Sequence, residues 1–153
     1  MIKKIVSNQY LLFLFRIILG FIFIYSGIIK INDTPGFSNS VYNYKLLPDF
    51  LINFLAIILP WIELSTGLLL ILGITIKENA LIISTLLIIF IIAIIINLFR
   101  GLDIDCGCFG TGNGTKIGLT KLIENTILLI MGILLMLSDS KFFLFPLKKM
   151  FNY

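Results

Sequence analysis

The sequence predicts an all-α, polytopic membrane protein that folds as a bundle of four transmembrane helices. The chain of 153 residues is 59% hydrophobic and 13% charged, whereas a soluble domain is about half apolar and about a quarter charged. Its mean hydropathy is +1.09, and the apolar residues come in long blocks, which are typical of membrane spans. The chain therefore has too little polar surface to coat a water-soluble globule. Its length suits a single membrane domain, residues 1–153.

Four apolar blocks are long enough to cross a lipid bilayer. The first follows Lys3 and Lys4, a basic start that a cleaved signal peptide would also have. However, its apolar run is longer than a typical signal-peptide core, and no small-x-small cleavage site follows it, so we expect a retained helix. The predicted spans cover residues 10–29, 51–74, 80–99 and 119–137.

One face of the first span carries small and charged residues at helical spacing. Arg16, Gly20, Phe23, Gly27 and Lys30 are separated by four, three, four and three positions, which places them on one side of a helix. Small residues let a neighbouring helix approach closely. An arginine in hydrocarbon costs at least ~2.5 kcal/mol on insertion scales, so we expect this face to point into the bundle.

The second span carries Glu63 near its centre, just after Pro60 and Trp61. A carboxylate in a membrane is costly unless it is paired or protonated. If the first two spans are antiparallel, Arg16 and Glu63 lie at similar depths, and an ion pair would offset part of their burial cost. Such a pair either fixes helix register or handles protons or a quinone. Pro60 and Trp61 fit a kink and an interfacial anchor.

Two longer segments and one short turn connect the spans. Asp33-Thr34-Pro35-Gly36 is turn chemistry, and we expect a short interfacial helix from Phe37 to Leu47, closed by Pro48. Lys77 and Glu78 are expected in a short turn. The segment 100–118, between the third and fourth spans, is rich in glycine.

The distribution of cations predicts the orientation. One side of the membrane receives both termini and the short turn, and the other side receives the two longer connectors. The count is six against five, and the clustering at both termini favours cytoplasmic termini. The glycine-rich connector would then face the outside, or the periplasm, where disulfide chemistry is normally run. The cations of the first side are Lys3, Lys4, Lys77, Lys141, Lys148 and Lys149, and those of the second are Lys30, Lys45, Arg100, Lys116 and Lys121.

The glycine-rich connector contains Asp105-Cys106-Gly107-Cys108-Phe109-Gly110, which holds both cysteines of the chain. In an extended chain the two cysteine Cα atoms lie roughly 6–7 Å apart, at the upper edge of the range for a disulfide. A bend at Gly107 shortens this distance. The resulting small ring is strained, and strained disulfides exchange readily. The flanking glycines leave both sulfurs accessible to a partner.

Several roles stay open for the two cysteines. The cysteines could form a reversible dithiol, a structural short-loop disulfide that closes almost no chain, or a carrier site for a soft metal such as Cu(I), or they could be inert. Two sulfurs without any histidine cannot fill a zinc or iron–sulfur site, so we expect no such metal. Cations at Arg100 and Lys30 would favour the thiolate, whereas Asp103 and Asp105 would oppose it. These charges also fit a simple interfacial position. The dispersed lysines form no basic face, which argues against nucleic-acid binding.

With these residues in view, the chain resembles the DoxX/MauE family of four-span membrane proteins. The matching features are Arg16-x3-Gly20, Gly27-x2-Lys30, Pro60-Trp61-x-Glu63 and the motif from Asp105 to Gly110. The resemblance implies a redox-associated role in the maturation of disulfide-containing exported proteins, beside a thioredoxin-like partner in a bacterial cytoplasmic membrane. It does not imply methylamine as the substrate.

We therefore expect Cys106 and Cys108 to form the reactive pair. The chain lacks the second cysteine pair of quinone-coupled disulfide enzymes, so a quinone acceptor has no residue signature here, and the sequence leaves open whether the chain is an enzyme. The rival hypotheses are a non-enzymatic membrane scaffold for a redoxin and a small-solute or soft-metal carrier. The expected supporting residues are Arg16, Lys30, Glu63, Arg100, Asp105, Gly107, Phe109 and Gly110.

Overall fold

The computed structural model confirms an all-α fold. It describes residues 9–101 and 118–138, and every regular element within these ranges is a helix. Four of the five helices are long and apolar enough to cross a membrane, so the chain is a multi-pass membrane protein. The helices are α2 (Gln9–Asn32), α3 (Thr34–Asn43), α4 (Asp49–Leu72), α5 (Ile76–Phe99) and α6 (Leu119–Leu137).

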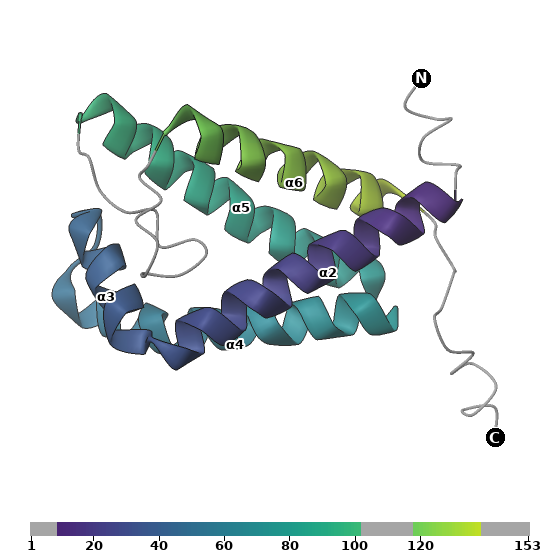
Figure 1. Ribbon diagram of the computed structural model, residues 1–153, viewed down its shortest axis with the longest axis horizontal. Helices are drawn as coiled ribbons and strands as arrows, with labels where there is room; N and C mark the ends of the chain where they lie inside the picture. Colours follow the sequence, from purple (N-terminus) through teal and green to yellow (C-terminus); the bar gives the residue numbers. More distant parts are fainter. Residues whose placement is uncertain (1–8, 102–117, 139–153) are drawn as a thin grey trace.

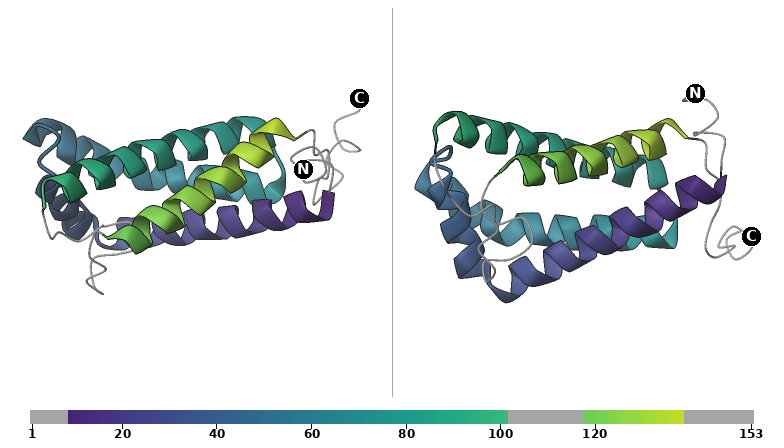
Figure 2. Two further views of the ribbon diagram at one scale, coloured as in Figure 1. Left: turned by 90° about the horizontal axis from the view of Figure 1, so that it is seen from above. Right: turned by 45° about the horizontal axis from the view of Figure 1, so that its top comes forward.

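The four long helices pack as two antiparallel pairs. Helix α2 lies along α4, and α5 lies along α6, with closer packing within each pair than between the pairs (Figure 1). The short helix α3 covers one end of the bundle. At that same end α2 and α5 finish and α4 and α6 begin (Figure 2). The end with α3 therefore gathers the helix ends that flank both longer connectors.

Glycines allow α2 and α4 to pack with their backbones in contact. A Cβ atom added at Gly27 would lie 2.8 Å from the Pro60 carbonyl oxygen, and one at Gly67 would lie 2.9 Å from the Gly20 carbonyl oxygen. Such small-residue contacts stabilise helix pairs in membranes, where no hydrophobic effect drives association. The predicted inward face of the first span is confirmed, because Arg16 and Lys30 are also buried.

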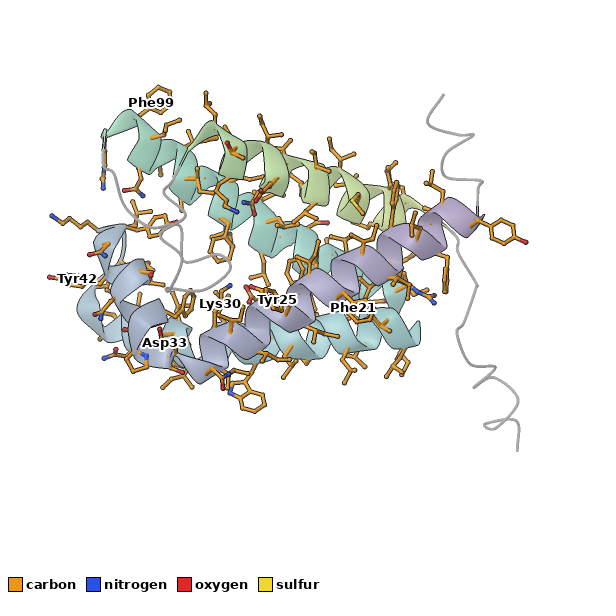
Figure 3. All side chains as sticks on the ribbon, viewed as in Figure 1. Phe21, Tyr25, Lys30, Asp33, Tyr42 and Phe99 are labelled. Carbon is orange, nitrogen blue, oxygen red and sulfur yellow. The ribbon has the colours of Figure 1, made fainter. Side chains whose placement is uncertain are left out.

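The apolar core fills the part of the bundle remote from α3. Leu19 of α2, Leu70 of α4, Ile83 of α5 and Leu135 of α6 are fully buried there. Large apolar side chains also cover the outer surface: Phe99 at the end of α5 is 89% exposed and points away from the bundle (Figure 3). An outer surface of this kind suits contact with lipid chains.

The first connector differs from its predicted form. Helix α2 continues to Asn32, and the segment Asp33–Gly36 is the beginning of α3 and not a separate turn. The Asp33 carboxylate accepts a hydrogen bond from the Gly36 amide at 3.0 Å, which is a helix N-cap. Helix α3 ends at Asn43, before the predicted end at Leu47. Pro48 has extended backbone and precedes α4.

The turn predicted at Lys77 and Glu78 was wrong, because both residues lie in the first turn of α5. The chain reverses at Gly73–Thr75. Gly73 has a φ of 77° and ends α4, as glycine commonly does at helix C-termini. Glu78 favours the helical state of its own segment, because a carboxylate stabilises the positive end of the helix dipole.

Candidate functional site

A buried ion pair joins α2 to α4. The Lys30 Nζ lies 2.6 Å from Oε1 and 2.8 Å from Oε2 of Glu63. The Ser26 hydroxyl donates a third hydrogen bond to Oε2 at 3.1 Å. Both Lys30 and Glu63 are only 2% exposed. Each charge thus has a partner inside the membrane bundle, which offsets part of the cost of burying it.

The helix geometry explains why these side chains meet. Ser26 and Lys30 are four residues apart and share one face of α2. Gly27 lies between them and rests against the backbone of α4 at Pro60 and Leu64. Glu63 is therefore held across the interface from Ser26, within reach of the Lys30 ammonium.

Two aromatic rings complete the surroundings of the lysine ammonium. The Lys30 Nζ lies 5.0 Å from the centroid of the Phe37 ring of α3 and 5.1 Å from that of Phe90 of α5. An ammonium over aromatic faces gains cation–π attraction, more so when it is desolvated. Lys30 thus contacts α3, α4 and α5 from its position on α2, and it points inward from that helix (Figure 3).

The predicted pair between Arg16 and Glu63 was wrong, because Glu63 pairs with Lys30. Arg16 precedes Ser26 by ten positions along α2. At about 1.5 Å per helical residue, its Cα lies about 15 Å further along the axis. Arg16 is nevertheless buried as predicted, and its guanidinium lies 5.0 Å from the centroid of the Phe13 ring. Antiparallel packing of two helices does not by itself place a given residue of one helix at the same depth as a given residue of the other.

A small cavity adjoins the ion pair and lies between the two helix pairs. Its volume, measured as the space open to the centres of water molecules, is about 30 Å³. This is room for about two water molecules, and it is too small for a quinone ring. The polar side chains on its wall are Ser26, Lys30 and Glu63 on one side and Asn125 of α6 on the other. Apolar side chains form the rest: Ile22, Phe23, Leu87, Phe90 and Leu128.

The remaining predicted site residues divide into two groups. Arg100 follows the last residue of α5 and is exposed, at the same end of the bundle as α3. Asp105, Gly107, Phe109 and Gly110 lie outside the described residues, as do the two cysteines. The structure therefore unites Lys30 with Glu63 and leaves the cysteine motif as a prediction from sequence.

Four members of the polar site were missed by sequence reasoning. Ser26 lies on the same helical face as Lys30, four residues before it, so the spacing in the sequence could have predicted that Ser26 belongs to the site. Asn125 is a polar residue near the start of a span, which is also a signal. Phe37 and Phe90 are common apolar residues of such a chain, and no local pattern distinguishes them from lipid-facing phenylalanines.

Known proteins resemble this chain over most of its length. The sequence model for the family described as "Methylamine utilisation protein MauE" matches residues 8–138. The chain is 30% identical over 114 residues to "Methylamine utilization protein MauE" of Paracoccus denitrificans, covering 74% of this chain and 61% of that protein. It is 37% identical over 93 residues to the protein of the same name in Methylorubrum extorquens, covering 60% and 50%.

A protein with a different name also matches. "Protein TlpB" of Flavobacterium psychrophilum is 32% identical over 115 residues, covering 69% of this chain and 31% of that protein. The chain therefore spans only part of its curated relatives. No solved structure matches it. Since the family model covers 131 of the 153 residues, counted from 8 to 138, the chain belongs to the MauE family.

Proposed function

We propose that this chain is a membrane thiol–disulfide exchange protein whose reactive groups are Cys106 and Cys108. The observation that carries the proposal is the Cys-Gly-Cys sequence in the segment between α5 and α6. Four of the chain's relatives are named methylamine utilization proteins. The broader role proposed here is therefore support of methylamine utilisation through disulfide formation in an exported protein.

The arrangement of the helices supports a surface position for the thiols. Helix α5 ends and α6 begins at the end of the bundle that α3 covers (Figure 2), so the described residues on both sides of the cysteine segment lie at that end. Lys30 is buried in an ion pair and no longer counts as a connector cation. The count of lysine and arginine becomes six against four, which favours cytoplasmic termini and an outward-facing cysteine segment.

Exchange with a partner disulfide balances without any further reagent. One thiolate attacks a sulfur of the partner disulfide, a mixed disulfide forms, and the partner's other sulfur leaves as a thiolate. The second thiolate of the Cys106–Cys108 pair then attacks the mixed disulfide. This closes the ring and releases the partner as a dithiol. The two thiols of this chain lose two protons and two electrons, and the partner disulfide gains them.

A thioredoxin-like protein is the partner that fits this chemistry. A single dithiol can only accept or pass on one disulfide, so the chain needs another dithiol protein to complete a cycle. In the reverse direction, the closed ring would oxidise the partner, which would then oxidise an exported protein. The alternative is a scaffold that holds a redoxin without exchanging disulfides.

Trapping of mixed disulfides tests the exchange. Cys106→Ser and Cys108→Ser are expressed separately in cells, membranes are quenched with acid, and disulfide-linked products are resolved without reductant. We expect at least one variant to accumulate a reducible adduct with a thioredoxin-like protein, and the double serine variant to accumulate none. The exchange proposal fails if neither single variant captures a partner and both support normal disulfide formation. Non-covalent co-purification with the double variant would indicate the scaffold instead.

Thiol labelling of intact cells tests the orientation. A membrane-impermeant maleimide should label the cysteines without permeabilisation of the inner membrane, and the double serine variant is the blank. Labelling that appears only after permeabilisation would place the segment in the cytoplasm and contradict the oxidative role.

A further inference from the structure

Asn125 of α6 brings to the cavity beside the ion pair an acceptor that no described residue satisfies. Asn125 is 5% exposed, and its amide nitrogen donates to the Lys121 carbonyl of its own helix at 2.8 Å. Its Oδ1 accepts no hydrogen bond from any described residue. A buried acceptor without a donor is costly, above all inside a membrane bundle. Because Asn125 lines the cavity, a molecule bound there can supply the missing donor.

The ion pair on the opposite wall has hydrogen-bonding capacity left after its own contacts. The Lys30 ammonium has three N–H donors, and two of its contacts go to Glu63. The Glu63 carboxylate has about four acceptor sites, of which Lys30 and Ser26 use three. These hydrogen bonds stay within the α2–α4 pair, and that of Asn125 stays within α6. One donor and one acceptor are thus left on this side of the cavity, with the Asn125 oxygen on the other.

These groups select a small neutral molecule that both donates and accepts hydrogen bonds. The Lys30 ammonium would repel a cation, and the Glu63 carboxylate would repel an anion. An apolar molecule would leave the Asn125 oxygen unsatisfied. The cavity volume of about 30 Å³ by water centres admits about two water molecules, each of which makes two to four hydrogen bonds. Water therefore fits the cavity both by size and by its pattern of donors and acceptors.

We propose that ordered water in this cavity bridges the Lys30–Glu63 ion pair to Asn125 and so joins the two helix pairs. One water molecule accepts the Lys30 N–H that Glu63 does not use and donates to the Asn125 Oδ1. A second donates to the remaining acceptor site of Glu63. Glu63 stays a carboxylate throughout, because the two contacts with Lys30 and the hydrogen bond from Ser26 stabilise its charge.

The bridge attaches the beginning of α6 to the ion pair. Asn125 lies in the second turn of α6, which starts at Leu119, shortly after the segment that contains both cysteines. The two helix pairs pack less closely against each other than the helices within each pair. Phe90 of α5 contacts the Lys30 ammonium directly, with its ring centroid 5.1 Å from Nζ. The water adds a hydrogen-bonded contact between the pairs beside this ring contact.

Water-edited solid-state NMR of the full chain in lipid bilayers tests the proposal, because magnetisation moves from water only to nearby protein carbons. We expect early transfer to the side-chain carbonyl carbon of Asn125 and to the Glu63 carboxylate. Asn97 is the matched control, since it is a fully buried asparagine of α5 that does not line the cavity. Its side-chain carbonyl carbon should gain magnetisation much later. Equal build-up at Asn125 and Asn97 would overturn the inference.

Asn125→Leu tests the bridge itself, because it removes the acceptor on the α6 wall with little change in volume. Transfer from water to the Glu63 carboxylate should fall about twofold, since about two waters fit and one loses its partner. Asn97→Leu should leave this transfer unchanged. Native transfer in Asn125→Leu, with the helical circular dichroism intact, would contradict the bridge. Neither cysteine takes part, so the double serine variant should give the native result whatever the outcome of the exchange experiments.

Discussion

Lys30 of α2 and Glu63 of α4 form a two-point ion pair, with Nζ–Oε distances of 2.6 and 2.8 Å, inside the membrane bundle. The pair connects the two helices that the glycine contacts bring together. Through Phe37 and Phe90 it also reaches α3 and α5. The ion pair therefore links the α2–α4 helix pair to α3, the short helix that covers one end of the bundle.

Removal of one partner should cost far more than removal of both. Glu63→Gln leaves the Lys30 charge buried beside a neutral amide, so we expect a loss of about 3–5 kcal/mol. Lys30→Met with Glu63→Gln removes both charges and should lose much less than the sum of the losses in Lys30→Met and Glu63→Gln. Reversible unfolding in detergent micelles gives the coupling energy of the double-mutant cycle. Additive losses would show that the pair contributes no specific interaction.

The ammonium site should accept a free alkylammonium ion when its lysine is removed. Lys30→Ala vacates the space between Glu63 and the two phenylalanine rings, and methylammonium has the charge and size to enter it. At about ten times its Kd the ion should restore about 1.4 kcal/mol, measured as a rise in Tm. Lys30→Met, which fills the space without a charge, is the control and should not respond. An equal rise in Tm with potassium would show that the effect comes from ionic strength and not from binding of methylammonium at this site.

Gly27 should tolerate no side chain, because its neighbour is backbone. A Cβ there would meet the Pro60 carbonyl oxygen at 2.8 Å and the Leu64 nitrogen at 3.0 Å, so Gly27→Ala must push α2 away from α4. We expect a loss of about 1–3 kcal/mol. Gly132→Ala is the matched control in α6, since its Cβ would meet the Ser84 hydroxyl, a side-chain atom that rotates away. Thermal unfolding of both variants should give a clearly lower Tm for Gly27→Ala than for Gly132→Ala.

Stability should decrease in alkaline solution through Tyr44. This residue lies just after α3, outside the spans, and burial raises the pKa of its phenol to about 12. Because the unfolded phenol has a pKa of about 10, its contribution is fully present below pH 10 and is lost as the pH rises toward 12. Tyr44→Phe should show a flatter Tm profile in this window. Identical profiles for both proteins would contradict the burial of this phenol.

The membrane class and the inward face of the first span were predictable from sequence, because both depend on local composition and helical spacing. Arg16, Gly20 and Lys30 recur on one side of any helix formed by these residues. The residues at which the helices end and the connectors begin were harder to predict from sequence. The same Asp-Thr-Pro-Gly segment can form a turn or start a helix. In the structure it starts a helix, because the Phe37 amide donates to the Asp33 carbonyl at 3.0 Å and the helical backbone continues to Asn43.

The sequence by itself determined that Glu63 needs a partner, since a lone carboxylate in hydrocarbon is too costly. The tertiary structure decided that the partner is Lys30 and not Arg16. That choice depends on the axial register of α2 against α4, which Gly20, Gly27 and Gly67 set by backbone contact. The tertiary structure also decided that Phe90 and Asn125 share the site, because α5 and α6 reach α2 and α4 only when the two helix pairs pack together. Phe37 joins them because α3 packs against α2 and α4.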